Sequence, residues 1–127
     1  MRCRLRADGG VVTTQLVIAT PALLTLLMLV VQLGLWLHAS HVVHAAAQEG
    51  ARAARAETGT DAAGRARATQ LLDGLAGELL TDRTVTATRD GLTARVEITG
   101  HVIPVVPALR VPVRAVSHGP IERFTSP

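Results

Sequence analysis

Three histidines have a spacing that could support metal chemistry, because His38, His41 and His44 recur every three positions. On a helix, neighbouring members of such a series approach each other, and imidazole is a common zinc ligand. The outer pair, however, is rotated by about 120° around the helix axis, and no cysteine or carboxylate completes a ligand set nearby. We therefore expect a polar helix face near the lipid headgroups, with no metal and no cofactor.

Other arrangements that could do catalysis are missing from the sequence. The acidic residues of the second half are scattered, and no Ser–His–Asp or Cys–His spacing indicates an activated nucleophile. No glycine-rich loop is placed to hold a phosphate, and the single cysteine, Cys3, cannot form an internal disulfide. The sequence therefore predicts a protein that is not an enzyme and has no small-molecule substrate.

The charge and the aromatic content argue against a nucleic-acid partner. All 13 basic residues are arginines and 10 residues are acidic, but three of the arginines and one aspartate lie within residues 1–10. Without that leader the chain has 10 arginines against 9 acids, a net charge of +1. Trp36 and Phe124 are the only aromatic residues, too few to stack bases.

The first predicted structural element contains a long apolar run. Residues 16–37, LVIATPALLTLLMLVVQLGLWL, carry no charge and span about 33 Å as a helix, against a hydrocarbon thickness of roughly 30 Å. Pro21 predicts a mild kink in this helix, and Trp36 lies where an interfacial aromatic anchor is expected. Arginines before the run, and none close after it, predict a cytoplasmic N-terminus and an extracytoplasmic remainder.

A cleaved secretory signal is the alternative interpretation of this run. Such signals have an apolar core of about 7–15 residues and a small-x-small cleavage site, so the run is too long, although LHASH and HAAAQ resemble cleavage sites. N-terminal sequencing of the mature protein separates the possibilities. A start near His41 or Gln48 would indicate a signal peptide, and a start at Met1 or Arg2 would indicate an uncleaved anchor.

The helix is predicted to continue beyond the membrane. Residues 38–57 are rich in alanine, contain no proline, and place polar and apolar residues on different sides. One helix over residues 11–57, near 70 Å long, would then combine a membrane-spanning half with an amphipathic half. Glu49, Arg52 and Arg55 have helical spacing, which fits either surface ion pairs or a contact with another subunit.

Residues 58–127 are predicted to form a small extracytoplasmic head with a C-terminal tail. Thr60 or Asp61 can cap a second helix. Its expected apolar face consists of Ala68, Leu71, Leu72, Leu75, Leu79 and Leu80. Three strands and one helix make a very small core, which we expect to rest on the apolar face of residues 42–54. The predicted fold class is therefore α+β: a long N-terminal helix with a small head of one helix and a three-stranded antiparallel sheet.

The strands are indicated by a change of the apolar period to two. The segments TVTATR and LTARVEI flank Asp90-Gly91, a strong signal for a two-residue hairpin turn. The pairs expected from that turn are Arg89 with Leu92, Ala87 with Ala94, Val85 with Val96, Thr86 with Arg95, and Thr84 with Glu97. A third strand is predicted at about residues 109–117, and Pro112 places it at an edge of the sheet.

Three features near the N-terminus occur in a characteristic order. A basic leader ends in glycine just before the helix (RCRLRADGG, then VVTTQLVIATPALLTLL), a proline lies early in that helix, and the membrane half runs into AAAQEGARAAR. Over residues 8–57 this combination resembles the TadE-like pilus assembly family, the minor pilin-like components of tight-adherence (Flp) systems. The resemblance implies a structural, pseudopilin-like protein whose β-rich remainder is compatible with the family.

The resemblance also implies processing by a prepilin-type peptidase after Gly10, which leaves Val11 as the new N-terminus. Pilins usually carry glutamate at the fifth mature position, where it is thought to pair with the terminal amine of an adjacent subunit. In this chain that position is Gln15. Glutamine accepts a hydrogen bond but does not neutralise an amine, and an unpaired charge in lipid is costly. The difference favours an accessory subunit or a membrane anchor over the shaft protein.

On this interpretation the chain is a single-pass protein of the cytoplasmic membrane that helps to assemble or anchor a Flp-type pilus or a related secretion machine. Its partners would be the lipid bilayer, other pilin-like or tight-adherence subunits, and the peptidase. The candidate assembly residues are Gln15, Pro21, Glu49, Arg52 and Arg55. A stand-alone membrane-anchored or secreted binding domain without a pilus role is the alternative. Neighbouring genes for a secretion ATPase and polytopic assembly proteins would separate the two.

Overall fold

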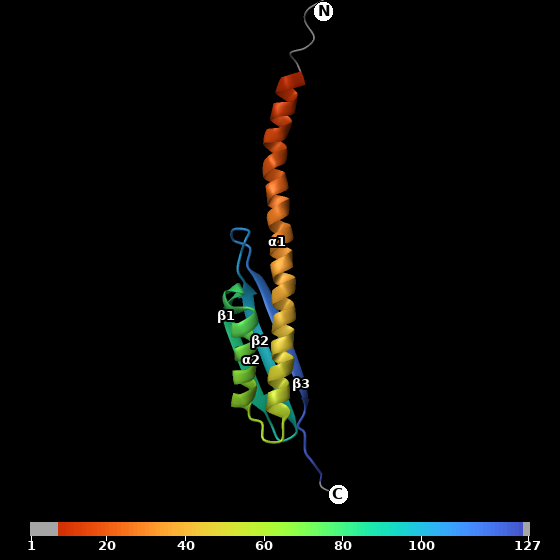
Figure 1. The fold of residues 1–127 in the computed structure, drawn as a ribbon, viewed down its shortest axis with the longest axis vertical. Helices are drawn as coiled ribbons and strands as arrows, with labels where there is room; N and C mark the ends of the chain where they lie inside the picture. The colour runs from red at the N-terminus through yellow and green to blue at the C-terminus, as the bar shows by residue number, and fades with distance from the viewer. Residues whose placement is uncertain (1–7, 126–127) are drawn as a thin grey trace, which may run out of the picture.

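The computed structural model describes residues 8–125, so that Cys3 and the arginines of the leader lie outside the described residues. The elements in chain order are α1 (Asp8–Arg55), α2 (Asp61–Leu75), the short 3-10 helix η1 (Gly77–Leu79), β1 (Leu80–Arg89), β2 (Thr93–Val102) and β3 (Val111–Pro120). One long helix carries α2 and the sheet along its C-terminal half (Figure 1). The predicted fold class, α+β with a long N-terminal helix and a small head, is confirmed.

Helix α1 is a single helix of 48 residues, about 72 Å long at 1.5 Å per residue. It begins at Asp8 and ends at Arg55, so that both ends lie a few residues before the predicted bounds. Pro21 lies inside the helix and does not end it. Because proline has no N–H, the carbonyl of Val17 loses its helical partner at this point.

Helix α2 begins where the sequence predicts a cap. The side-chain oxygen of Thr60 accepts a hydrogen bond from the N–H of Ala63 at 3.0 Å, which satisfies one of the free N–H groups of the first turn. The buried side of the helix is formed by Gly64, Ala68 and Leu72. Leu75, predicted on that side, is 56 % exposed, because the helix ends there and the chain turns.

The sheet is antiparallel in the order β1-β2-β3. The predicted two-residue turn is wrong, because Arg89 pairs with Ala94 and not with Leu92. The Asp90 carboxylate accepts hydrogen bonds from the N–H groups of Leu92 at 2.9 Å and Thr93 at 2.7 Å, which closes the loop over residues 90–92. The other pairs shift by the same two residues, to Ala87 with Val96, Val85 with Ile98, Thr86 with Glu97, and Thr84 with Thr99. A two-residue shift keeps every side chain on its predicted face, since the period of a strand is two.

The third strand, β3, lies at an edge of the sheet, as Pro112 predicts. It begins at Val111 and continues to Pro120, two residues later at its start and three later at its end than expected. Strand β1 is also longer than predicted, because it already begins at Leu80.

The core lies between one face of the sheet, α2 and the C-terminal half of α1. Its largest fully buried side chains are Leu72, Ile98, Val43, Val96 and Val102. Alanines on α1 complete it, namely Ala39, Ala46, Ala47 and Ala51. The head therefore rests on the apolar face of α1, as predicted from residues 42–54.

Candidate assembly site

The N-terminal part of α1 projects beyond the head (Figure 1). Most of its exposed side chains are apolar. Residues 11–31 are exposed, apart from the half-buried Met28. Within the described part of the chain, α1 is the one helix that is long and apolar enough to cross a membrane. We call residues 11–31 the bare segment. A helix that is apolar all round is suited to lipid or to other apolar helices.

Hydroxyl groups on the bare segment bond to the helix's own backbone. Thr14 donates to the carbonyl of Gly10 at 2.9 Å. Thr20 and Thr25 do the same toward Leu16 and Pro21, each at 2.8 Å. These bonds to the preceding turn keep the threonine hydroxyls satisfied where no water is available.

The residues of the implied processing site lie in the first turns of α1. A side chain at Gly10 would meet nothing within 4 Å, and Val11 is 66 % exposed. Gln15 is exposed one turn further on, and its side chain makes no hydrogen bond within the part of the chain that the structure describes. Pro21 is also exposed. These four positions are far along α1 from the head and are open to a partner.

The charged residues near the C-terminal end of α1 divide into two groups. Glu49 and Arg52 form an ion pair at 3.0 Å, in which the Arg52 side chain is 70 % exposed. Arg55 does not join them: its guanidinium lies against Gly119 of β3, where a Cβ would be 2.5 Å from Nη1. The backbone carbonyl of Arg55 also accepts a hydrogen bond from Glu122 N at 3.0 Å. Arg55 therefore joins α1 to the sheet, whereas Arg52 is available on the surface.

A close crossing of α1 and α2 is absent from the sequence-based expectations. A Cβ added to Gly50 would lie 2.8 Å from the carbonyl oxygen of Gly64, and one added to Gly64 would lie 2.8 Å from the same group of Gly50. Ala54 and Ala68 complete the contact, each four residues after one of the glycines. The signal in the sequence is two pairs of small residues at helical spacing, which allows the backbones to touch.

Gln32 is a further residue whose contacts the sequence does not predict. It lies in the uncharged run, yet only 3 % of it is exposed. Its Oε1 accepts hydrogen bonds from Val105 N at 2.6 Å and Val106 N at 3.4 Å, and its Nε2 donates to the carbonyl of Ile103 at 3.3 Å. A polar residue in the middle of an apolar span is a signal for such a partner.

Trp36 adds a contact one turn beyond Gln32. Its Nε1 donates to the backbone carbonyl of Pro112 at 3.3 Å. The indole therefore fixes the start of β3 to α1. Together, Gln32 and Trp36 join the head to the helix at the end of the head that adjoins the bare segment.

The outer face of the sheet carries an ion-pair cluster with no feature of an acid–base site. Glu97 on β2 contacts Arg95 at 3.0 Å and Arg114 on β3 at 2.8 Å. The hydrogen bond from Arg95, followed by the charge of Arg114, lowers the pKa of Glu97 from its usual value. A carboxylate held ionised in this way is unsuited to proton transfer near neutral pH.

The histidine series lies on the surface of α1. His38, His41 and His44 are all exposed, and His44 Nδ1 lies 2.7 Å from the carbonyl oxygen of Ser40. Over residues 8–125, no group of three or more histidine, cysteine, aspartate or glutamate side chains is arranged to hold a metal ion.

Comparison with protein families matches residues 10–52 to the model described as TadE-like protein. The match begins at Gly10, includes Gln15 and Pro21, and ends at Arg52, before the head. Comparison with curated proteins and with solved structures gave no match. The resemblance predicted from the sequence is therefore confirmed over this segment of α1.

Proposed function

We propose, from the TadE-like segment at residues 10–52, that this chain is a minor pilin-like component of a tight-adherence pilus system. It would help to assemble or anchor a Flp-type pilus or a related secretion machine. The family supports a structural role in such a system and a single-pass membrane location. The observation that carries the proposal is that the matched segment includes residues 11–31, the part of α1 that the other described elements leave exposed.

The proposed mechanism is association of helices, not catalysis. In lipid, helices associate through close van der Waals packing and through hydrogen bonds between polar side chains. The bare segment offers apolar side chains all round and one free amide, that of Gln15. The Gly50–Gly64 crossing fixes the other half of α1 to the head, so that binding of the bare segment to other subunits would also position the head.

Cleavage after Gly10 would create an amine at Val11, one helical turn from Gln15. Residues four apart on a helix lie about 6 Å from each other, and helical side chains point toward the N-terminus. The Gln15 amide oxygen could therefore accept a hydrogen bond from this amine or from that of a neighbouring subunit. Because no full charge is paired, the contact would be weaker than the one glutamate makes, in keeping with an accessory subunit.

N-terminal sequencing of protein isolated from the membranes of its own host tests the processing step. We expect the mature chain to start at Val11. Gly10→Ile should block cleavage, whereas the matched Gly34→Ile, at another glycine of α1 with open space around it, should leave cleavage intact. A start at residue 1 or 2 in the unmodified protein would contradict the proposed processing.

Deletion of the gene in its host tests the pilus role itself. We expect fewer surface pili by electron microscopy, and recovery when the full chain is restored. A photo-crosslinker at Leu24 of the bare segment should capture another pilin-like subunit, whereas one at Leu92, exposed at the far end of the head, serves as the control. Normal pili in the deletion strain would favour the alternative, a membrane-anchored or secreted binding domain without a pilus role.

A further inference from the structure

The loop between β2 and β3 is apolar although it lies on the surface. Residues 103–109 read IPVVPAL and contain no polar side chain. Pro104, Pro107, Ala108 and Leu109 are exposed, and the remaining three are half-buried. Loops that face water are usually rich in polar turn residues, so this composition indicates a different surrounding.

The backbone conformation at Ala108 strengthens the evidence for an apolar surrounding of the loop. Ala108 has a φ of 64°, in the left-handed region. Glycine or asparagine adopts this conformation with less strain than alanine. The sequence therefore keeps an apolar side chain even where a polar residue would suit the backbone better.

Backbone N–H groups in this loop are almost all satisfied inside the protein. Those of Val105 and Val106 donate to Gln32 Oε1. That of Ile103 donates to the Leu79 carbonyl at 3.0 Å, and that of Leu109 to the Val106 carbonyl at 3.1 Å.

The remaining positions of the loop leave one free donor. Pro104 and Pro107 have no N–H, so that Ala108 is the single loop residue whose N–H is without a partner among the described residues. Pairing of nearly all N–H groups is needed where water is scarce, because an unpaired N–H in lipid costs several kcal/mol, about as much as a hydrogen bond in an apolar medium.

The loop lies at the level where the bare segment ends. It points along α1 toward the bare segment (Figure 1), and its bonds to Gln32 fix that level. Residues 11–31 span about 32 Å as a helix, which matches a hydrocarbon thickness of roughly 30 Å. If the bare segment fills the hydrocarbon layer, the loop lies at the outer boundary of that layer.

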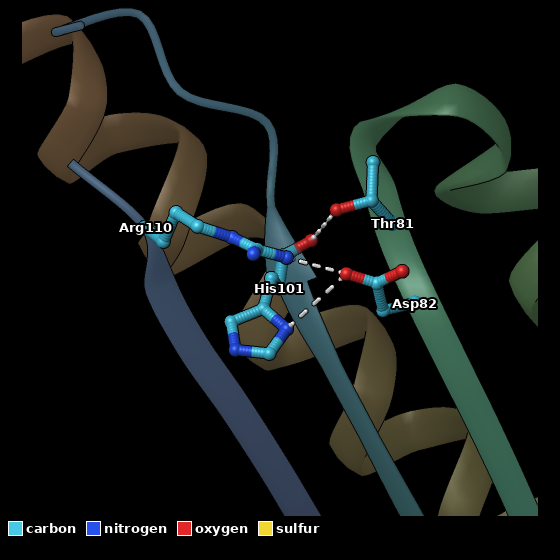
Figure 2. A network of polar contacts seen from close by, with 4 residues as sticks. All are labelled: Thr81, Asp82, His101 and Arg110. Atoms are coloured by element: carbon cyan, nitrogen blue, oxygen red, sulfur yellow. Dashed lines mark hydrogen bonds and ion pairs between the residues drawn. The ribbon is translucent and has the colours of Figure 1, made fainter. Parts of the chain in front are cut away.

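Charged side chains begin directly behind the loop. Figure 2 shows Arg110 and His101 directed at Asp82, with Thr81 beside them on β1. Arg110 forms an ion pair with Asp82, and His101 Nδ1 lies 3.9 Å from the same carboxylate oxygen. The surface therefore changes from an apolar loop to a charged cluster. A bilayer changes in the same order, from apolar acyl chains to polar headgroups.

We propose that the β2–β3 loop, residues 103–109, is seated in the outer interfacial layer of the lipid bilayer. The membrane-embedded part of α1 is then residues 11–31 and not 16–37, and the head has its own contact with lipid. This inference concerns the anchored chain alone and holds with or without a pilus role.

Depth-dependent fluorescence quenching tests this seating with the full chain. A Cys3→Ser background receives either Leu109→Cys in the loop or Leu92→Cys at the opposite end of the head, each labelled with an environment-sensitive dye. Both leucines are exposed, 37 % and 73 % respectively, so labelling should leave the fold intact, which thermal melting checks. The protein is placed in vesicles of phosphatidylethanolamine and phosphatidylglycerol that contain nitroxide-labelled lipid.

We expect the Leu109 dye to show blue-shifted emission and a several-fold larger quenching by nitroxides near the headgroups than the Leu92 dye. Equal quenching at both positions would overturn the proposal. Blue-shifted emission at Leu109 without lipid quenching would also overturn it, because a protein surface would then cover the loop.

Discussion

At the residue scale, two glutamines of α1 with apolar neighbours have opposite environments. The Gln15 side chain is exposed and makes no hydrogen bond among residues 8–125, whereas the Gln32 side chain is buried and bonds to three backbone groups of the β2–β3 loop. The Gln15 side chain is available to another chain, whereas the Gln32 side chain already binds the backbone of its own chain. Residue type and the hydropathy of the neighbouring residues do not distinguish the two glutamines. The difference arises because the head packs beside Gln32 and not beside Gln15.

Replacement of each glutamine by leucine should separate the two roles. Gln32→Leu leaves the N–H groups of Val105 and Val106 without a partner, which should cost about 1–3 kcal/mol of head stability. Gln15→Leu should leave stability unchanged, because its side chain contacts nothing that folding buries. Hydrogen exchange of the full chain in lipid nanodiscs checks both, with Val105 as the reporter amide. Equal exchange at Val105 in the two variants would contradict the assigned role of Gln32.

A carboxylate in the hairpin loop should make stability depend on pH. Hydrogen bonds from Leu92 N, Thr93 N and the Thr93 hydroxyl lower the pKa of Asp90 below its usual value of 3.8. A lowered pKa in the folded state stabilises the protein above the unfolded pKa, and this stabilisation is lost as the pH falls through the folded value. We therefore expect unfolding to become easier below about pH 4.

Asp90→Asn isolates this contribution, because the asparagine carbonyl can accept the same backbone hydrogen bonds but does not titrate. Its melting temperature should fall less steeply between about pH 4 and pH 2 than that of the unmodified chain. Glu97→Gln, at the other carboxylate with a lowered pKa, should remove a separate part of the dependence. Parallel curves for Asp90→Asn and the unmodified protein would show that the turn carboxylate has no effect.

At the element scale, the contact between α1 and α2 depends on two glycines that face each other. Gly64 has a backbone carbonyl and the Ala54 methyl group each 2.8 Å from the place of its missing Cβ, whereas Gly74 of the same helix has open space. The backbone of Gly50 cannot move away without shifting α1 from the sheet. The two glycines of α2 therefore offer a matched pair for substitution.

The same substitution at these two sites should change stability in opposite directions. Gly64→Ala forces the helices apart, and overpacking of this kind costs about 1–3 kcal/mol. Gly74→Ala meets no atom and raises helix propensity, so it should stabilise by up to about 1 kcal/mol. Melting temperatures of the full-length variants in detergent check the signs. A neutral Gly64→Ala would mean that the crossing is looser than described.

The hairpin shows at the same scale how far local sequence predicts structure. Alternating residue types predicted the existence of the two strands and their faces correctly, although both strands are longer than predicted. The two-residue turn was wrong because the Asp90 side chain bonds to the backbone two and three residues later, and this extends the loop past Gly91, so that Arg89 pairs with Ala94. An Asp-Gly pair is compatible with both loops, so that the choice depends on the side chain's partners.

At the scale of the whole molecule, the two halves of α1 have different surroundings. Its N-terminal half is bare and its C-terminal half is part of the head's core (Figure 1). The charged residues near the end of α1 also differ in their surroundings. Arg55 lies against β3, while Arg52 of the Glu49–Arg52 pair remains exposed. A membrane contact of the head would hold both halves in a fixed orientation to the bilayer.

The orientation itself can be tested with reporter fusions to the C-terminus. A phosphatase that is active only outside the cytoplasm should be active there, and a fluorescent protein that matures only in the cytoplasm should be dark. We expect this orientation because arginines precede the apolar run, and basic residues remain on the cytoplasmic side of the membrane. Replacement of Arg2, Arg4 and Arg6 by glutamine should reduce the phosphatase signal. The reverse pattern of reporter activity would contradict the proposed topology.

The sequence by itself determined the features that arise from neighbours along the chain. The long helix, its apolar run, a helix cap at Thr60 or Asp61, the alternating faces of the strands and the TadE-like segment all follow from local spacing and residue type. The tertiary structure alone decided the bonds of Gln32 to residues more than 70 positions away, the meeting of Gly50 with Gly64, and the place of Arg55 on β3. Those contacts depend on which surfaces the fold brings together, and periodicity within one element carries no information about its partner.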